Sequence, residues 1–392
     1  MRIWFSLLSL WMLILLQSTC LSVNGFQFVN QQPNRLPVEQ LRLRSSKKSE
    51  SSKAESQTTV GTILSNADVI DTRNGKVCKA IDSRDLIRPS LPFWNINNGS
   101  NNLLKTRKKW LVVVMPQLGD FDSAEYAELL TCVISDLQEA NIELRVIGIG
   151  NIQSARMFSQ HTGLPLDYIR VDPKAQLHSQ LRLHRGPDWD IPTWIPQSIL
   201  DWFAEQVGVD IRIADTSRNV ARGWLNYLAM CAGIAAPGTL REILRGYIGD
   251  KSAPERLRAD EVIQAGPIVI EGVVNVQLGP IKYKSLWKDE VGYQRPAELA
   301  TVRLRSMVEI LTNMNQYVPD QSLIDWRGAT FLLDSSSCTD NGVPLYEYRD
   351  RGVLTYSETM SRPLSFLTQW IGEERAKNPL GLRDPESHVD SP

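Results

Sequence analysis

Apolar residues recur through the middle of the chain in short runs that alternate with helical stripes. The first run, Leu111–Met115, is β-branched and too short for a buried helix, so it predicts a buried strand. A proline and a glycine follow it and predict a turn. A helix is then expected to begin near Asp122, a candidate N-cap with Glu125 three positions on. The pattern thus delivers the chain to a helix N-terminus, where backbone N–H groups and a partial positive charge can stabilise a reactive group.

Strand and helix then continue to alternate. The expected elements are a helix over Ser123–Ala140, a strand over Ile142–Ile149, a helix over Ile152–His161, a strand over Tyr168–Val171 and a helix over Lys174–Leu183. Repetition of this kind requires a mostly parallel sheet with right-handed crossovers. The expected fold class is therefore α/β, with helices flanking the sheet.

From about residue 186 to residue 320 this alternation stops. Tryptophan- and proline-rich turns come first, and we interpret the whole segment as a large, mainly helical insertion. Its expected elements are helices near Trp224–Ala232, Thr239–Gly249 and Pro296–Tyr317, with strand-like pieces over Pro267–Val276. After it the pattern predicts two strands in hairpin order and a terminal helix, over Gly328–Leu333, Val343–Tyr348 and about Ser361–Glu374.

Residues 1–25 are expected to be a signal peptide and not part of the fold. An arginine precedes an apolar run over Ile3–Leu16, which is short for a membrane span and is followed by small and polar residues. Phe26 then opens a basic, hydroxylated tract over residues 26–56. This arrangement resembles the two-part plastid presequence of diatoms and related algae, which implies import into a chloroplast of secondary origin through the secretory pathway. Plain secretion with a disordered linker is the alternative.

Composition narrows the candidate chemistry. With 392 residues, 42% of them hydrophobic, the chain can bury a large core. Its net charge of −1 gives no electrostatic reason to expect a nucleic acid as partner. One of the five cysteines lies in the expected signal peptide, the others form no C-x-x-C pair, and the four histidines lack metal-ligand spacing. We therefore expect no disulfide framework, no metal site and no cofactor, and no membrane span in the mature chain.

Four stretches resemble one known family, in the same order along the chain. They are Leu111–Pro116, Val146–Gly150, Tyr168–Asp172 and Trp326–Asp334. They resemble the first strand, the second strand, the strand–Asp–helix element and the arginine-bearing strand of the peroxiredoxin (AhpC/TSA) family, most of all its cyanobacterial and plastid members. The resemblance implies a thioredoxin-like fold. The expected parts are then a signal peptide (1–25), a transit-like segment (26–56), an extension (57–108), a thioredoxin-like domain (109–374, insertion about 186–320) and a flexible tail (375–392).

The resemblance also implies where the chemistry of that family would lie. The family's loop places a Thr or Ser, and then the peroxidatic Cys, at positions that correspond here to Asp120 and Ser123. Arg327 corresponds to the active-site arginine. A serine hydroxyl cannot become the thiolate that peroxidase chemistry needs, and Asp120 adds a negative charge beside it. We therefore expect no ordinary peroxidase cycle at Ser123, and we expect Arg327 to pair with Asp120 or Asp122.

Other candidates are weaker. Cys231 lies in a small, apolar, helical stretch, where a buried structural cysteine is favoured over a relocated redox thiol. Cys338 lies in a serine-rich loop and is the more accessible candidate. A redox role for either predicts a lowered thiol pKa. Ser123 as a hydrolase nucleophile would need a histidine base, and nothing in the sequence brings His161 or His178 close to it, so a structural role in the first helical turn is favoured.

Two hypotheses about function follow. The first is a plastid peroxiredoxin-like protein of the antioxidant, thiol-redox type, which lacks the usual peroxidatic cysteine and is served, if it is a thiol-dependent peroxidase, by a thioredoxin-type reductant. The second is a non-catalytic thioredoxin-fold scaffold whose insertion contacts a plastid protein. The second hypothesis predicts an exposed apolar patch on the insertion. The insertion's tryptophans are nevertheless expected to form mainly a packed satellite core, and they are Trp189, Trp194, Trp202 and Trp224.

Overall fold

The computed structural model divides the chain into two units, Met1–Thr58 and Thr59–Pro392. The residues that the structure describes all belong to the second unit. They are residues 59–82, 108–207, 209, 216–234, 236, 239, 253–257, 262–265, 268–270, 276–278, 281–284, 295–334, 337, 342–352, 356–357 and 361–382. The expected presequence, the expected helix over Thr239–Gly249 apart from Thr239 itself, and Cys338 lie outside these residues.

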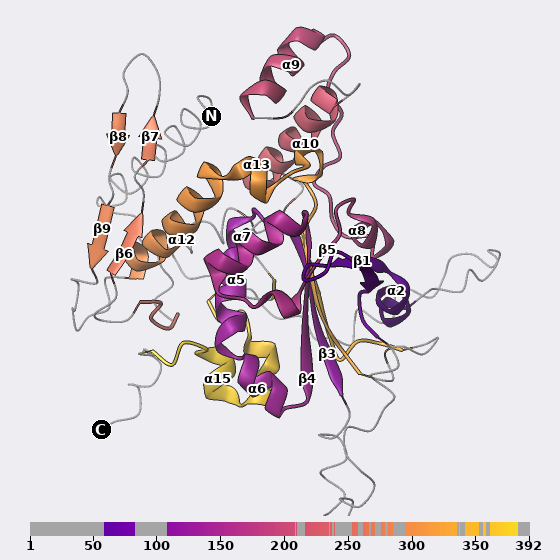
Figure 1. Ribbon diagram of the computed structural model, residues 1–392, viewed down its shortest axis with the longest axis vertical. Coiled ribbons are helices and arrows are strands. Elements are labelled where there is room, and N and C mark those ends of the chain that lie inside the picture. The colour runs from indigo at the N-terminus through magenta and orange to yellow at the C-terminus, as the bar shows by residue number, and fades with distance from the viewer. Residues whose placement is uncertain are drawn as a thin grey trace, which may run out of the picture. The chain divides into compact units, whose positions relative to one another are not determined.

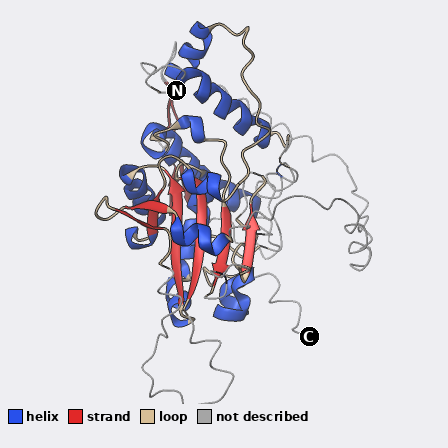
Figure 2. Ribbon diagram, turned by 90° about the vertical axis from the view of Figure 1, so that its right-hand side faces the viewer, coloured by secondary structure: helices blue, strands red, loops and turns tan. Residues whose placement is uncertain are grey.

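A seven-stranded mixed sheet forms the centre of the described unit (Figures 1 and 2). Its strands, in spatial order, are β11 (Tyr346–Arg349), β10 (Ala329–Leu333), β3 (Lys109–Gln117), β4 (Ile142–Ile149), β5 (Ile169–Val171), β1 (Asp68–Asp71) and β2 (Val77–Lys79). β3, β4 and β5 are parallel, and the strands on either side of them pair antiparallel. This sheet with its flanking helices has the thioredoxin-like α/β architecture expected from the sequence.

β3 is buried along its whole length, because helices cover both faces of the sheet. Alternate side chains of a strand point to opposite faces. Leu111, Val113 and Met115 therefore pack with one hydrophobic cluster, and Trp110 and Val112 pack with another. The first cluster is covered by α5 (Phe121–Cys132), α6 (Ile134–Glu139), α7 (Ile152–Thr162) and the terminal helices α14 (Thr368–Ile371) and α15 (Glu373–Lys377). The second is covered by α2 (Val60–Asn66) and α8 (Gln176–Gln180), on the other side of the sheet in Figure 1.

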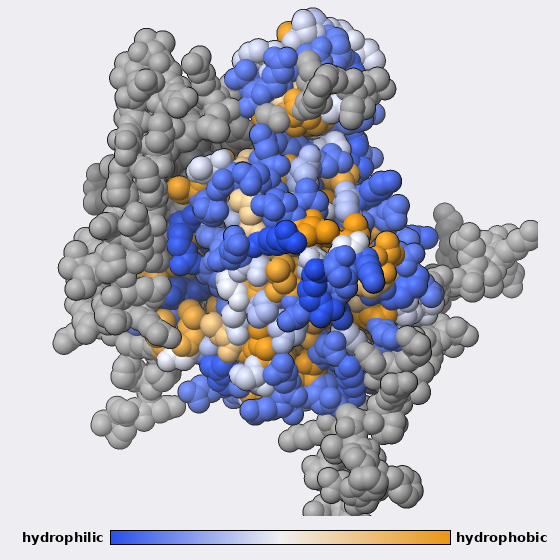
Figure 3. Space-filling view, in the orientation of Figure 1, coloured by the Kyte–Doolittle hydropathy of each residue, from blue (hydrophilic) through white to orange (hydrophobic). Residues whose placement is uncertain are grey.

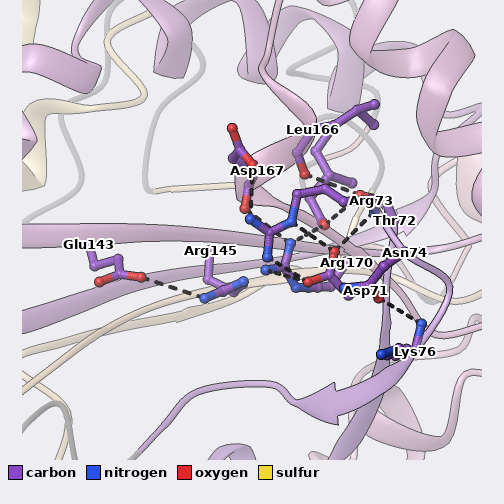
Figure 4. Close-up of polar contacts among 11 residues, drawn as sticks. Asp71, Thr72, Arg73, Asn74, Lys76, Glu143, Arg145, Leu166, Asp167 and Arg170 are labelled. Atoms are coloured by element: carbon purple, nitrogen blue, oxygen red, sulfur yellow. Dashed lines mark hydrogen bonds and ion pairs between the residues drawn. The ribbon is translucent and has the colours of Figure 1, made fainter.

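The expected extension over residues 57–108 contributes two strands to the same sheet. β1 pairs with β5, and Figure 4 shows the polar contacts that lie beside this pairing. Asp71 accepts a bond of 2.7 Å from Arg73 and lies 3.3 Å from Arg170 of β5. The hydrogen bond from Arg73, aided by Arg170, lowers the pKa of Asp71 to about 2. Arg73 also reaches Asp167 at 3.1 Å, so this charge cluster is balanced and holds β1 and the turn after it to the core.

Several helices differ from the predicted ones in length. The expected helix over Ser123–Ala140 is interrupted at Val133, which separates α5 from α6. The expected helix over Lys174–Leu183 shortens to α8, because Ala175 adopts a left-handed conformation (φ 52°) before it. The expected terminal helix is a succession of short turns that includes α14 and α15. Apolar residues recur at helical spacing through all three regions, and this spacing does not reveal where the backbone interrupts a helix.

The expected insertion is mixed in structure. Its described elements are α9 (Gln197–Gln206), α10 (Thr216–Cys231), α12 (Arg295–Thr312), α13 (Met314–Tyr317) and two small antiparallel pairs, β6 (Val262–Ala265) with β9 (Ile281–Lys284) and β7 (Ile268–Ile270) with β8 (Val276–Leu278). α12 packs against α5 of the core. Among the described residues, no helix has the length and apolar character to cross a bilayer.

Candidate functional site

The junction between β3 and α5 brings the expected site residues together. A Cβ atom on Gly119 would lie 2.4 Å from Val318 Cγ2, so only glycine fits the turn. Asp120 is the N-cap of α5, and its Oδ2 accepts a hydrogen bond of 3.1 Å from the backbone N–H of Ser123. The prediction that Asp122 caps this helix is therefore wrong. Asp122 lies inside the first turn, because the helix begins one residue earlier at Phe121.

Ser123 is fully buried at the N-terminus of α5. Its Oγ donates to Asp120 Oδ2 at 3.0 Å and lies 2.5 Å from the phenolic oxygen of Tyr356, which donates to it. Burial raises the pKa of Tyr356, and the nearby Asp120 carboxylate adds to the effect, so the phenol stays protonated. The ring of Tyr356 stacks on that of Tyr126, with centroids 4.8 Å apart. The hydroxyl of Ser123 is thus held between a carboxylate and a phenol.

Arg327 precedes β10 and is almost completely buried between two carboxylates. Its Nη2 lies 3.7 Å from Asp120 Oδ1, and its Nε donates to Asp350 Oδ2 at 3.4 Å. Burial by itself lowers the pKa of Arg327, but the charges of Asp120 and Asp350 outweigh it and raise the pKa. The predicted pairing of Arg327 with Asp120 is confirmed.

Asp122 and Glu125 occupy the same buried helical turns but differ in their partners. Asp122 Oδ2 has no hydrogen-bond partner, and burial together with the charge of Asp120 raises its pKa. Glu125 forms salt bridges with Arg256 at 2.8 Å and with Arg303 at 3.1 Å. Burial raises the pKa of Glu125, but these two guanidinium groups outweigh it, so the pKa is lowered. Glu125 therefore ties α5 to the insertion and does not complete the expected capping box.

Cys231, the last residue of α10, is close enough to this site to interact electrostatically with Arg327, Asp120 and Asp122. The thiol is partly buried and not in a disulfide. Burial raises its pKa to about 12, and the positive charge of Arg327 offsets only part of that rise. A relocated redox thiol requires a lowered pKa, and for Cys231 that prediction is wrong.

One comparison with known proteins bears on this site. The sequence model of the family described as AhpC/TSA antioxidant enzyme matches residues 129–352, more than half of the chain. The chain belongs to the AhpC/TSA family. No curated protein and no solved structure matches it. Membership of the AhpC/TSA family makes this a protein of the thiol-redox, antioxidant type, with a peroxiredoxin-like, thioredoxin-like fold.

The AhpC/TSA match contains some of the candidate site residues and not others. Arg327 and Cys231 lie within it, whereas Asp120 and Ser123 precede its first residue. The structure places all four in one neighbourhood: Ser123 and Arg327 each contact Asp120, and Cys231 lies within electrostatic reach of Arg327 and Asp120.

The two histidines considered as bases for Ser123 have other partners in this AhpC/TSA chain. His178 bonds to the carbonyl oxygen of Met115 at 2.8 Å and lies 3.6 Å from Asp172, so it joins α8 to β3. His161 bonds to Ser306 Oγ at 3.1 Å. Neither histidine therefore serves as the base that hydrolase chemistry at Ser123 would need. Among the residues that the structure describes, no three His, Cys, Asp or Glu side chains gather into a candidate metal site.

Sequence reasoning missed two residues of the site. Asp350 and Tyr356 follow β11, more than 200 positions after Ser123, and reach Arg327 and Ser123 only because β11 pairs with β10. No motif or spacing marks either residue. The only signal was that β10 and β11 form a hairpin, which brings the segment after β11 back beside the start of β10.

Proposed function

We propose that this chain is a plastid peroxiredoxin-like protein of the antioxidant, thiol-redox type in which Ser123 occupies the peroxidatic position. The observation that carries the proposal is the closed contact of Arg327 with Asp120 beside a fully buried Ser123 hydroxyl. In a working site of this kind, a helix N-terminus and an arginine stabilise a thiolate. Here the negative charge in that place belongs to Asp120, and the group on α5 is a hydroxyl that cannot be oxidised to a sulfenic acid.

Peroxide turnover at Ser123 is therefore absent under this proposal, and Cys231 is the one described thiol beside the site. With its pKa raised to about 12, only a minute fraction of that thiol is ionised at neutral pH. The test is peroxide consumption by the full chain with thioredoxin as reductant, comparing the wild type with Cys231→Ser. We expect neither protein to exceed the rate without protein. Turnover in the wild type that disappears in Cys231→Ser would assign the activity to Cys231.

The plastid location rests on the signal-like residues 1–25 and the basic tract that begins at Phe26. A fluorescent protein fused to residues 1–56 is expected to enter the plastid of an alga with a secondary chloroplast, whereas a fusion to residues 1–25 is expected to be secreted. Secretion of both fusions would favour the alternative location.

A second candidate function is a non-catalytic scaffold that binds a partner protein in the plastid. It is favoured by the insertion's exposed apolar side chains. They are Trp189, Trp194, Ile199, Trp202, Leu228 and Ile234. The expectation that the insertion's tryptophans form a core holds for Trp224, which is buried, and is wrong for Trp189, Trp194 and Trp202. A silent peroxide assay together with a bound partner would support the scaffold, and peroxide turnover would reject it.

A further inference from the structure

Residues 186–209 combine acidic and large aromatic side chains. They contain four acidic residues, no lysine or arginine and three tryptophans, in a protein whose net charge is −1. Asp188 pairs with Arg222 of α10 at 2.8 Å, and Asp201 accepts from Ser217 Oγ at 2.6 Å. Among the described residues, Asp190 and Glu205 form no ion pair and face solvent.

The same segment exposes large apolar side chains. Trp194 is 79% exposed, Ile199 53% and Trp202 50%. Leu200 and Ala204, on the opposite side of α9, are buried, and α9 contacts α10. Ile199 and Trp202 are three positions apart, so they lie on one helix face that is about half exposed. In Figure 3, hydrophobic and hydrophilic atoms lie side by side at the top, where Figure 1 places α9.

The surface is held in place by α10. The backbone N–H of Trp189 donates to Asn226 Oδ1 at 2.8 Å, and Arg218 donates to the carbonyl oxygen of Ile191 at 3.0 Å. These bonds fix the loop that leads to α9. A fixed surface loses less conformational entropy when it binds a partner than a loose one does. We call it the acidic tryptophan surface, made of Trp189, Asp190, Trp194, Ile199, Trp202 and Glu205.

Charge decides between the possible occupants of this surface. Nucleic acids and anionic membranes carry the same sign of charge as the surface, so both are disfavoured. A second copy of this chain would bring the same acidic residues face to face. A basic, amphipathic segment has the opposite charge and supplies apolar side chains to cover the tryptophans.

We propose that the acidic tryptophan surface binds a basic, amphipathic segment of a partner protein. The partner's apolar residues cover Trp194, Ile199 and Trp202, and its lysine or arginine residues face Asp190 and Glu205. This inference deepens the scaffold function and names the chemistry of its partner.

The test uses the full chain and a synthetic peptide of leucine and lysine at amphipathic-helix spacing, about 18 residues long. Binding is measured by calorimetry and by the shift of tryptophan emission. We expect the Leu/Lys peptide to bind, and we expect matched Leu/Glu and Ser/Lys peptides not to. The dissociation constant is expected to rise about tenfold in Trp194→Ala/Trp202→Ala. It is also expected to rise in Asp190→Asn/Glu205→Gln, and to rise with added salt.

The control variant is Val343→Ala, which removes an apolar side chain that is 73% exposed and lies outside the insertion. It is expected to bind the peptide as the wild type does. Equal binding by all variants, or no binding of the Leu/Lys peptide, overturns the inference. A concentration-dependent dimer in sedimentation velocity that Trp194→Ala abolishes would give the surface to a second copy and also overturn it. Peroxide consumption, measured on the same proteins, distinguishes a failure of this inference from a failure of the scaffold function. If the peptide does not bind and no peroxide is consumed, only the proposed binding surface is rejected. If peroxide is consumed, the scaffold function is rejected.

Discussion

Two carboxyl groups at the start of α5 show how strongly burial and partners decide the state of a residue. Asp120 contacts Arg327 and caps the helix, whereas Asp122 is equally buried and has an oxygen with no hydrogen-bond partner. The resemblance was enough to predict Asp120, Ser123 and Arg327 as a group. It could not predict which aspartate caps the helix, because the two candidates differ only in the residue at which the helix begins.

Asp122→Asn is expected to stabilise the protein at neutral pH. The folded-state pKa of Asp122 is raised, so its contribution to stability is fully present below the unfolded value of about 3.9 and is lost as pH rises. Asparagine keeps a neutral group there at every pH. We expect a gain of about 1 kcal/mol in the free energy of unfolding at pH 7.

The measurement is urea unfolding at pH 7 and below pH 4, where the gain should vanish. Asp68→Asn is the control, because Asp68 pairs with exposed Lys79 at the surface and its loss should change stability little. A loss of stability at pH 7 in Asp122→Asn would contradict the assignment of a raised pKa.

At the scale of elements, the sequence predicted five of the seven strands of the sheet, missed β1 and β2, and placed the helix ends poorly. β3, β4 and β10 are apolar runs whose burial follows from their composition, and the left-handed Gly163 (φ 75°) ends α7 as expected. The contact between α5 and α12 depends on residues far apart in sequence. Glu125 carries that contact, because Arg256 and Arg303 both come from the insertion.

Glu125→Gln is expected to loosen the insertion from the core. Removing one partner of a buried ion pair leaves two buried guanidinium groups without their shared carboxylate, which costs about 3–5 kcal/mol. The folded-state pKa of Glu125 is lowered, so its stabilisation is present above the unfolded value and is lost as pH falls through the lower folded value.

Thermal unfolding near neutral pH and below about pH 4 tests this, because the penalty of Glu125→Gln should shrink on acidification. Glu347→Gln is the matched control: Glu347 pairs with Arg349 in a half-exposed position, where the effect is expected to stay within about 1 kcal/mol. Equal penalties for the two variants would show that Glu125 does not carry the contact.

At the scale of the whole molecule, an AhpC/TSA sheet supports two regions with different properties. The site at the tip of β3 is closed, because Asp120 and Asp350 neutralise Arg327 internally. The acidic tryptophan surface on the insertion is exposed to solvent. The number of tryptophans in the sequence could not predict which of them would be exposed. Trp202 lies on the face of α9 opposite Leu200 and Ala204, which pack inward, and this follows only from knowing which face of α9 meets α10.

The most direct test of the account is the thiolate pKa of two variants, Ser123→Cys and Asp120→Thr/Ser123→Cys, measured by thiolate absorbance against pH in a Cys231→Ser background. In the wild type, Ser123 Oγ donates to the Asp120 carboxylate 3.0 Å away. In the single variant this carboxylate faces the new thiol and disfavours its ionisation, so the thiol pKa should lie above about 8.5. In the double variant, Arg327 faces the new thiol without that carboxylate, and the pKa should fall by at least one unit, with faster oxidation by peroxide. Circular dichroism of each variant verifies its fold. Equal pKa values in two folded variants would contradict the claim that the Asp120 carboxylate pairs with Arg327 where a peroxidatic thiolate would otherwise do so.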